Sequence, residues 1–372
     1  MGFVYGSHHT ATEAPKCPVC GEYAVFSREA ELKPTLAMKG LVSCRVGCTI
    51  CDLYNAHTTD DKNAAFAEWE TGKIRVAKLD TVVFPSDYFN PEAVDPDLQA
   101  EYDAVLENEA LTPVLFSYEA WFERGKLALS DASLEFLKQG SSSIFEKAKG
   151  AVYRGWMMKP EQYARFYEEL RKHNIFLMTL PEEYSALHLF PNVYAQVRED
   201  SARIQTFPLH THIDIADVLE SFPRFMVKDY VKSVKGTEFP SFFDENVTQE
   251  EFDRWMEVFY KYRGDLLTGG ICIKEYLDLK RYGGKTNEHR AFYANGETIS
   301  LSPNSGQGTL ALKPPQEFVN KYKNLGSPFY TVDYAELADG SWRVIETGDG
   351  GVSGLSDGQD AGAFFRALHA AF

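Results

Sequence analysis

Two acidic residues near the C-terminus have the spacing of metal ligands on a β-hairpin. Asp333 and Glu346 lie on either side of an Asp339-Gly340 pair, which between two alternating segments is typical of a hairpin turn. Side chains alternate between the two faces of a strand, and we expect both carboxylates on the same face. Carboxylate oxygens are the ligands that Mg²⁺ prefers in proteins. The stretch therefore offers two ligands for a magnesium ion, although two acids alone are more typical of an exposed hairpin.

Basic residues upstream are of the kind that binds phosphate. Lys228 lies in the middle of an apolar run, FMVKDY, where a charged side chain is costly unless it has a partner. Lys232 and Lys235 follow in a segment that ends at Gly236, and Arg290 lies on a strand before an Asn-Gly turn. Taken alone, Lys228 would also fit an edge strand, and the two acids would fit an exposed hairpin. Together they favour a site for metal-bound phosphate.

A third segment is suited to a purine nucleoside. The strand in CIKEYLDL ends in Glu275, Tyr276, Leu277 and Asp278. We expect its backbone to hydrogen bond to the edge of an adenine, its apolar side chains to cover the ring, and Asp278 to bind the ribose hydroxyls.

The order of these motifs resembles the ATP-grasp superfamily. The segments FMVKDYVKSVKG, IKEYLDL, HRAFYANGE and VIETGDGGVSGL are most similar to its RimK-like amidoligase branch, and within it to uncharacterised bacterial and phage members with an extra pair of lysines. VYRGWMMKPEQY, which contains Arg154, resembles the segment that precedes the grasp domain. The likeness covers roughly residues 150–356 and leaves out the cysteine-rich N-terminus.

The resemblance implies a role for each basic residue. Lys228 would contact the α- and β-phosphates of ATP, and Lys232 or Lys235 would close a flexible loop over the triphosphate. Arg290 would stabilise the transferring phosphoryl group. The residues expected to be catalytic are thus Arg290, Lys235 and Arg154, with Arg154 near the acceptor substrate.

The resemblance also implies the adenine and metal contacts. Residues 275–277 would meet the adenine, with Asp278 near the ribose, and Asp333 and Glu346 would coordinate Mg²⁺. The family usually has an Asn two residues after the second acid as a further metal ligand, and here that position is Gly348. The neighbouring Asp349, or a water, is left to fill the place.

The expected activity follows from the same resemblance. ATP-grasp ligases phosphorylate a carboxylate to an acylphosphate, which an amine or another nucleophile attacks. We therefore expect an ATP- and Mg²⁺-dependent carboxylate–amine or carboxylate–thiol ligase that acts on small-molecule or peptide substrates. Two alternatives stay open. Gly348 would suit a non-catalytic ATP-binding adaptor with the same fold, and the cysteine-rich start would suit a nucleic-acid ligase or nucleotidyltransferase.

Cysteines near the N-terminus have the spacing of a zinc site. Cys17-x-x-Cys20 and Cys48-x-x-Cys51 form two CxxC pairs with 27 residues between them, and each pair offers two thiolates to one tetrahedral ion. Cys44 competes for a ligand position. We predict one structural Zn²⁺, with unliganded buried cysteines or a redox pair as the alternative.

Composition limits the partners and the compartment. The 372 residues carry a formal net charge of -16, which makes nucleic acid an unexpected partner because such binding is driven by basic residues. The sequence contains no run of about 18 apolar residues and no signal-peptide pattern at its start. We expect a cytoplasmic protein without membrane contact.

The elements that position these residues divide the chain into three expected domains. Residues 1–73 are the cysteine-rich, zinc-ribbon-like module, and residues 74–220 alternate strands and helices as in an α/β layer with parallel pairing. Residues 221–372 have antiparallel strands with inserted helices. The expected fold class is thus α/β with α+β: an ATP-grasp fold in which a pre-grasp domain precedes the grasp domain.

Overall fold

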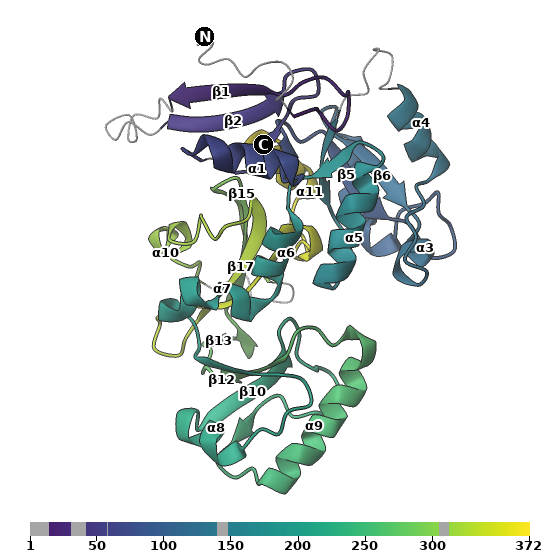
Figure 1. The fold of residues 1–372 in the computed structure, drawn as a ribbon. Helices are drawn as coiled ribbons and strands as arrows, with labels where there is room; N and C mark the ends of the chain where they lie inside the picture. Colours follow the sequence, from purple (N-terminus) through teal and green to yellow (C-terminus); the bar gives the residue numbers. More distant parts are fainter. Residues whose placement is uncertain (1–14, 31–41, 58, 140–147, 305–311) are drawn as a thin grey trace. The chain divides into compact units, whose positions relative to one another are not determined.

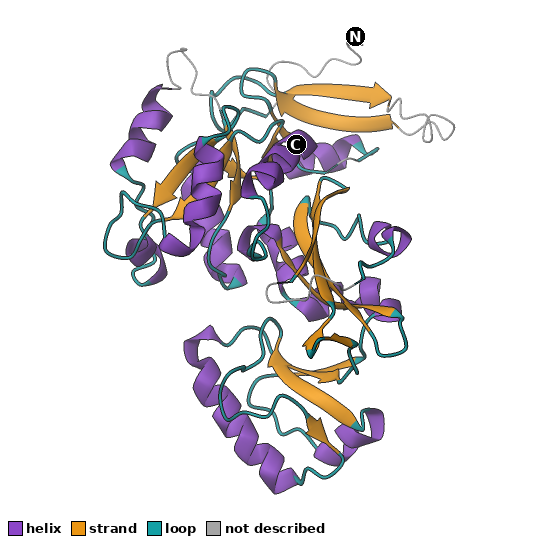
Figure 2. Ribbon diagram, turned by 180° about the vertical axis from the view of Figure 1, so that it is seen from behind, coloured by secondary structure: helices purple, strands orange, loops and turns teal. Residues whose placement is uncertain are grey.

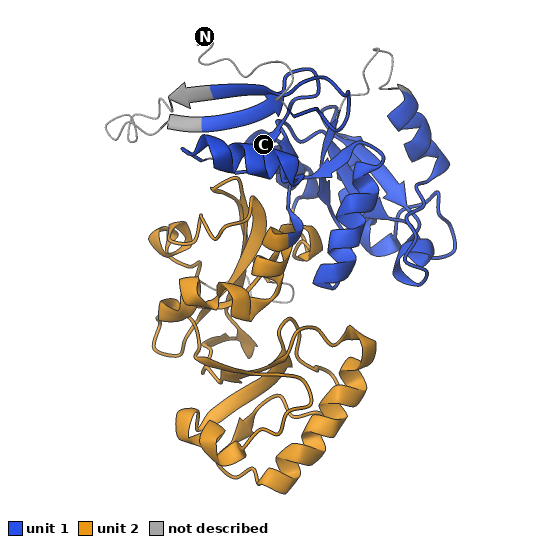
Figure 3. Ribbon diagram, viewed as in Figure 1, with its two compact units in different colours: residues 1–181, 360–372 blue, residues 182–359 orange. Residues whose placement is uncertain are grey.

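The computed structural model describes residues 15–30, 42–57, 59–139, 148–304 and 312–372 (Figure 1). The chain forms two compact units (Figure 3). Unit 1 comprises Met1–Pro181 and Asp360–Phe372, and unit 2 comprises Glu182–Gln359. Both units combine helices with sheets (Figure 2). The expected domain boundary at residue 73 lies inside unit 1, and the one at residue 220 lies inside unit 2.

A parallel sheet forms the centre of unit 1. Its strand order is β6-β5-β7-β8, with β5 (Thr81–Pro85), β6 (Thr112–Phe116), β7 (Lys149–Tyr153) and β8 (Ile175–Leu177). Every residue of β5 and β8 is buried, as in parallel sheets that helices cover on both faces. The helices of this region are α2 (Gln99–Leu106), α3 (Tyr118–Phe122), α4 (Asp131–Gln139), α5 (Pro160–Arg171) and α11 (Ala361–Ala371). The expected α/β layer with parallel pairing is confirmed.

The cysteine-rich region folds as a second sheet of unit 1. The sheet is antiparallel, in the order β1-β2-β3-β4, with β1 (Val25–Ala30), β2 (Val42–Cys48), β3 (Leu53–Asn55), β4 (Ile74–Val76) and the helix α1 (Lys62–Glu70). Its buried Val46 and Trp69 share a hydrophobic core with Phe176 of β8. Because of this shared core, residues 1–73 belong to unit 1 and do not form a compact unit of their own.

Unit 2 begins with a sheet that is apolar on one face and carries lysines on the other. The strand order is β11-β10-β12-β9, all antiparallel, with β9 (Ile204–Phe207), β10 (Arg224–Asp229), β11 (Phe243–Asp244) and β12 (Ile271–Glu275). Helices α8 (Ile215–Ser221) and α9 (Gln249–Arg263) pack against the apolar face. The alternate residues of β10 and β12, including Lys228 and Lys274, point to the opposite face.

The second sheet of unit 2 contains the hairpin with the two acids. Its order is β16-β15-β17-β18, with β15 (Glu288–Ala294), β16 (Glu297–Pro303), β17 (Phe329–Glu336) and β18 (Trp342–Asp349). Aromatic residues on one face, such as Tyr293 and Tyr330, pack against α7 (Phe190–Val197) and the segment around α10 (Gln316–Asn320). Asn295 and Gly296 both have positive φ, as a two-residue hairpin turn requires.

Short elements complete the described chain. They are α6 (Pro181–His188), β13 (Arg281–Tyr282), β14 (Lys285–Thr286), and the 3₁₀ helices η2 (Pro96–Leu98), η3 (Arg198–Asp200), η4 (Gly264–Leu266) and η5 (Gly350–Val352). No helix within the described residues is long and apolar enough to cross a membrane.

Candidate functional site

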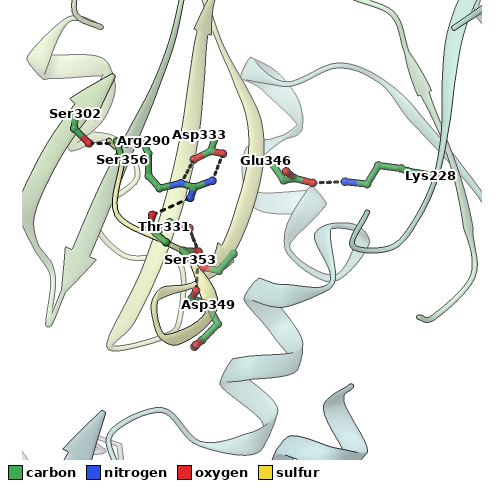
Figure 4. A network of polar contacts seen from close by, with 11 residues as sticks. Lys228, Arg290, Ser302, Thr331, Asp333, Glu346, Asp349, Ser353 and Ser356 are labelled. Atoms are coloured by element: carbon green, nitrogen blue, oxygen red, sulfur yellow. Dashed lines mark hydrogen bonds and ion pairs between the residues drawn. The ribbon is translucent and has the colours of Figure 1, made fainter. Parts of the chain in front are cut away.

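Four polar residues form a row across the second sheet of unit 2. Ser302, Arg290, Asp333 and Glu346 are direct neighbours on β16, β15, β17 and β18. Residues directly opposite each other in a sheet share a face, and the aromatic core of the sheet occupies the other one. The row therefore points away from the core, and Figure 4 shows Arg290 directed at Asp333, Glu346 directed at Lys228, and Ser302 beside Ser356.

A β-bulge in the hairpin brings Glu346 into this row. Tyr334 pairs with Val344, but Asp333 pairs with Glu346, so that Ile345 is an extra residue on β18. Without the bulge, Asp333 would face Ile345, and Glu346 would point into the core with Val344. The expectation that both carboxylates share a face is confirmed, and the bulge is its physical cause.

Arg290 and Asp333 form a two-pronged ion pair. Arg290 Nε and Nη2 each donate to a carboxylate oxygen of Asp333 at 2.7 Å, and Nη1 donates to the carbonyl of Gly354 at 3.2 Å (Figure 4). Burial by itself would lower the pKa of Arg290, but the hydrogen bonds and charge of Asp333 raise it. The guanidinium is thus charged and held in a fixed orientation.

Lys228 of β10 forms an ion pair with Glu346 of β18, which joins the two sheets of unit 2. Lys228 is buried, with 7% of its surface exposed. Its burial favours the neutral amine, but Glu346 raises the pKa of Lys228 above its ordinary value. Burial would raise the pKa of Glu346, but the charges of Lys228, Lys232 and Lys274 lower it to about 2. Both groups are charged at neutral pH.

Lys274 belongs to the same site, although the sequence analysis did not single it out. It lies on β12 opposite Met226, on the same face as Lys228, and is equally buried. Its ammonium group donates to the carbonyl of Ile345 and lies 4.5 Å from the centre of the Phe190 ring. Burial, together with the charge of Lys228, lowers the pKa of Lys274 to about 8. Antiparallel pairing of FMVKDY with CIKEYL is the signal that would have found it.

The loop lysines lie where β10 ends. β10 stops at Asp229 because the carboxylate of Asp229 accepts hydrogen bonds from the amides of Val231 and Lys232, at 2.7 and 2.6 Å, which turns the chain. Lys232 is exposed and close enough to Glu346 to lower its pKa. Lys235 is exposed in the same loop. The loop therefore carries two exposed lysines, and one of them, Lys232, lies close to the pair formed by the buried Lys228 and the half-buried Glu346.

Two of the backbone donors expected to meet adenine already have partners. The amide of Glu275 donates to the carbonyl of Arg203 at 2.9 Å, and that of Tyr276 donates to the carbonyl of Arg224 at 3.0 Å. The Glu275 carboxylate forms an ion pair with Arg203 at 2.8 Å. The geometry therefore does not support a hydrogen bond from the amide of Glu275 or Tyr276 to adenine. The amide of Leu277 and the carbonyl of Glu275 remain as candidate adenine contacts.

The side chains after β12 form an exposed cluster around Arg224. The guanidinium of Arg224 lies 4.2 Å from the centre of the Tyr276 ring and donates to Asp278 at 3.2 Å. The Asp278 side chain is 73% exposed, so its carboxylate is accessible to a hydroxyl-bearing ligand. The structure brings residues 275–278 together at the end of β12, as expected.

Arg154 lies in surroundings typical of a residue that stabilises the fold. It lies in unit 1, directly after β7, and only 1% of its surface is exposed. Its Nε and Nη2 each donate to the carboxylate of Glu101 at 2.7 Å, and the guanidinium packs 5.5 Å from the ring centre of Phe364. A buried, two-pronged pair of this kind holds α2 and α11 against the sheet. This geometry counts against the catalytic role expected for Arg154.

Asp349 points away from the row. Strand alternation after the bulge places Glu346 and Gly348 on the polar face, and Thr347 and Asp349 on the core face. Thr347 accordingly donates to the carbonyl of Leu187 at 3.0 Å, and Asp349 accepts from the amide of Gly351 at 2.8 Å to begin η5. The structure therefore does not bring Asp349 to the carboxylates of Asp333 and Glu346.

Four cysteines of unit 1 gather at one point. The sulfurs of Cys17, Cys20, Cys48 and Cys51 all lie within 4.8 Å of one another, and those of Cys20 and Cys48 are 3.5 Å apart. A Zn–S bond of about 2.3 Å in a tetrahedral site requires sulfurs about 3.8 Å apart, which this cluster fits. Cys44 lies outside it and contacts the carbonyl of Asp60 at 3.4 Å. Burial raises the pKa of the Cys17 thiol to about 11, and a bound cation would lower it by stabilising the thiolate.

Comparisons with known proteins agree with this fold. A family model described as an ATP-grasp domain matches residues 218–368. The D-alanine–D-alanine ligase from Coxiella burnetii is similar in structure, with 12% identity and a TM-score of 0.52 over 80% of this chain and 94% of that chain. Residues 218–368 thus match an ATP-grasp domain, and the chain has the ATP-grasp fold that the sequence predicted.

Other solved structures are similar at lower scores. The ATP-grasp ligase PsnB, complexed with minimal precursor, Mg and ADP, is 13% identical with a TM-score of 0.48 over 79% of this chain and 99% of that chain. The D-alanine–D-alanine ligase from Bacillus anthracis, complexed with ATP, is 11% identical with a TM-score of 0.49 over 79% and 97%. A search of curated proteins found no match.

Proposed function

We propose that this protein joins a carboxylate to an amine or a thiol, using ATP and Mg²⁺ and forming an acylphosphate. The match to an ATP-grasp domain and the fold shared with a D-alanine–D-alanine ligase support an ATP-dependent ligase. The observation that carries the finer proposal is the pairing of cations with carboxylates in unit 2. Lys228 pairs with Glu346 and Arg290 pairs with Asp333, all on facing polar surfaces of the two sheets.

The cations of this site are suited to a triphosphate. Lys228 and Lys274 project from adjacent strands of one sheet, and Arg290 projects from the other. In our proposal the two buried lysines bind the α- and β-phosphates, and Arg290 binds the phosphoryl group that is transferred. Lys232 and Lys235 lie on the loop that would cover the phosphates. Phosphoryl transfer depends mainly on positioning and charge neutralisation, which these groups supply.

The carboxylates fit a magnesium ion. Asp333 and Glu346 are cross-strand neighbours, and their oxygens are the hard ligands that Mg²⁺ prefers. The bound ion would neutralise charge on the transferring phosphoryl group. When Lys228 and Arg290 turn to phosphate oxygens, the two carboxylates lose their partners inside the protein. A buried carboxylate without a partner is costly, so we expect nucleotide and metal to bind together.

The reaction we propose has two steps. A carboxylate oxygen of the substrate attacks the γ-phosphorus of ATP, the bond from that phosphorus to the β,γ-bridging oxygen breaks, and ADP leaves. The nucleophile then attacks the acyl carbon, phosphate leaves with the bonding electrons, and the nucleophile loses its proton. Arg290 is placed to stabilise charge in the first step, and no serine or cysteine nucleophile is needed.

The test is nucleotide binding followed by product analysis. MgATP should raise the melting temperature of the wild-type protein, and Lys228→Ala should abolish this shift. Lys280 is a matched control, because it is a lysine of unit 2 that pairs with a glutamate, Glu336, outside the row. Lys280→Ala should keep the shift. Absence of any shift for the wild type would refute the proposal.

A panel of amino acids and short peptides, each with an amine or thiol acceptor, identifies the reaction. The ligase should release ADP and phosphate only when both substrates are present. Nucleotide binding without product in any combination would favour the non-catalytic adaptor, and AMP as product would favour nucleotidyl transfer.

We also propose that Cys17, Cys20, Cys48 and Cys51 hold one structural Zn²⁺. The four sulfurs form a closed set without an oxygen or nitrogen ligand, which is the usual composition of structural rather than catalytic zinc sites. The ion would link the first CxxC turn to the end of β2 and so stabilise the small antiparallel sheet.

A further inference from the structure

The segment that follows β18 folds back against the polar face of the second sheet of unit 2. We call residues 350–359 the strap. The carbonyl of Gly354 accepts from Arg290 at 3.2 Å, and the hydroxyl of Ser356 lies 3.3 Å from that of Ser302. Gln359 accepts from Ser302 at 3.0 Å through its side chain. The strap thus contacts Arg290 and Ser302, which are two of the four polar residues of the row.

Ser353 of the strap occupies the space where a side chain at position 348 would lie. Gly348 is opposite Thr331, one step along the strands from the Asp333–Glu346 pair and on the same face. A Cβ atom added to Gly348 would be 3.0 Å from Ser353 Oγ and 3.1 Å from Thr331 Oγ1. A side chain at position 348 would therefore have to push these two hydroxyl oxygens away by a few tenths of an ångström.

The hydrogen bonds orient these two hydroxyls. Ser353 Oγ donates to the carbonyl of Asp349 at 2.8 Å, which commits its only proton. The hydroxyls of Ser353 and Thr331 are 2.9 Å apart, and with the Ser353 proton on Asp349 the donor of that bond is Thr331, whose other acceptor, the carbonyl of Gly348, is farther away at 3.5 Å. Ser353 Oγ therefore acts towards the sheet as an acceptor. A hydroxyl oxygen that donates its proton elsewhere presents a lone pair in the remaining direction. Such an oxygen is suited to binding a cation.

We propose that Ser353 Oγ is the third protein oxygen of the metal site, with Thr331 as a positioning residue that orients it. Figure 4 shows Thr331 and Ser353 next to the Arg290–Asp333 pair. Thr331 is 2% exposed and Ser353 9%, so Ser353 is the one nearer to solvent. The inference rests on the proposed function, since it adds a ligand to the magnesium site formed by Asp333 and Glu346. It also explains how the site is completed with Asp349 turned to the core face.

The experiment measures metal binding rather than activity. Mn²⁺ replaces Mg²⁺, and free Mn²⁺ is followed by electron paramagnetic resonance in the presence of a saturating non-hydrolysable ATP analogue. Ser353→Ala should weaken Mn²⁺ binding about 10-fold, the scale seen when groups around a metal are removed. Ser356→Ala is the matched control, because Ser356 lies in the same strap but bonds to Ser302. It should leave the affinity unchanged.

A second variant separates loss of a ligand from disturbance of the strap. Ser353→Ala vacates space beside Gly348, so adding Gly348→Asn to it should restore the affinity with an amide oxygen. Thr331→Val keeps the shape of the side chain and should weaken Mn²⁺ binding less than Ser353→Ala. Equal Mn²⁺ affinity of Ser353→Ala and wild type would overturn the inference. If the wild type binds neither analogue nor Mn²⁺, the proposed function itself fails.

Discussion

Binding of MgATP should be coupled to uptake of a proton by Lys274. The ammonium group of Lys274 is buried beside Lys228, and its pKa in the ligand-free protein is lowered to about 8 from an ordinary value of 10.5. Phosphate oxygens at this site favour the charged amine and raise that pKa again. The protein must therefore take up a proton as it binds nucleotide at any pH where Lys274 is partly neutral.

The size of the effect follows from the pKa. With a pKa of about 8 and full protonation in the complex, uptake should be about 0.1 proton at pH 7, about 0.5 at pH 8 and about 0.9 at pH 9. Of the neighbours with a shifted pKa, none titrates in this range, because the pKa of Glu346 is about 2, that of His188 is about 3, and burial raises that of Cys272. A return to 10.5 corresponds to about 3 kcal/mol, so affinity should fall as the pH rises above 8.

Isothermal titration calorimetry measures the uptake directly. The same titration at pH 8 in two buffers of different ionisation enthalpy should give different apparent enthalpies, and their difference yields the number of protons. Lys274→Met should bind MgATP more weakly and remove the buffer dependence. Equal uptake by wild type and Lys274→Met, or none by the wild type at pH 8 and 9, would refute the reasoning.

Three further predictions concern single groups. Because the pKa of Glu346 is lowered to about 2 from 4.5, its charge stabilises the fold above pH 4.5, and this contribution is lost as the pH falls towards 2. Urea unfolding of Glu346→Gln should therefore differ most from wild type at neutral pH and converge with it in acid. Elemental analysis should find one zinc per chain, lost in Cys48→Ser and kept in Cys44→Ser, whereas zinc-free wild type would contradict the cluster. Arg154→Ala should cost about 3–5 kcal/mol of stability, and unchanged stability would contradict the structural role of its pair with Glu101.

Local patterns in the sequence were sufficient for much of the fold. The Asp-Gly and Asn-Gly turns, the helix that begins after Lys159 at Pro160, and the capping box of Thr248 and Glu251 all appear where their residue types predict them. Each depends on the conformational preferences of a few adjacent residues. The expected fold class and its ATP-grasp assignment could be reached because the motifs follow in a fixed order.

Features that depend on distant residues could not be reached in this way. The shared face of Asp333 and Glu346 was expected from alternation, but it requires the extra Ile345, which no local pattern marks. The partner of Arg154 is 53 residues away, and that of Glu275 is 72 residues away. Each ion pair is a product of tertiary packing. The sequence therefore indicated which residue types were available but not which of them were already paired.

Titration of the wild-type protein with ATP, with and without Mg²⁺, tests the central claim most directly. We expect one ATP bound per chain in the presence of Mg²⁺ and much weaker binding in its absence, because Asp333 and Glu346 then lack a cation. Lys228→Ala should lose the binding, and Lys280→Ala should keep it. Failure of the folded wild type to bind MgATP, or equal binding by Lys228→Ala, would contradict the site described here.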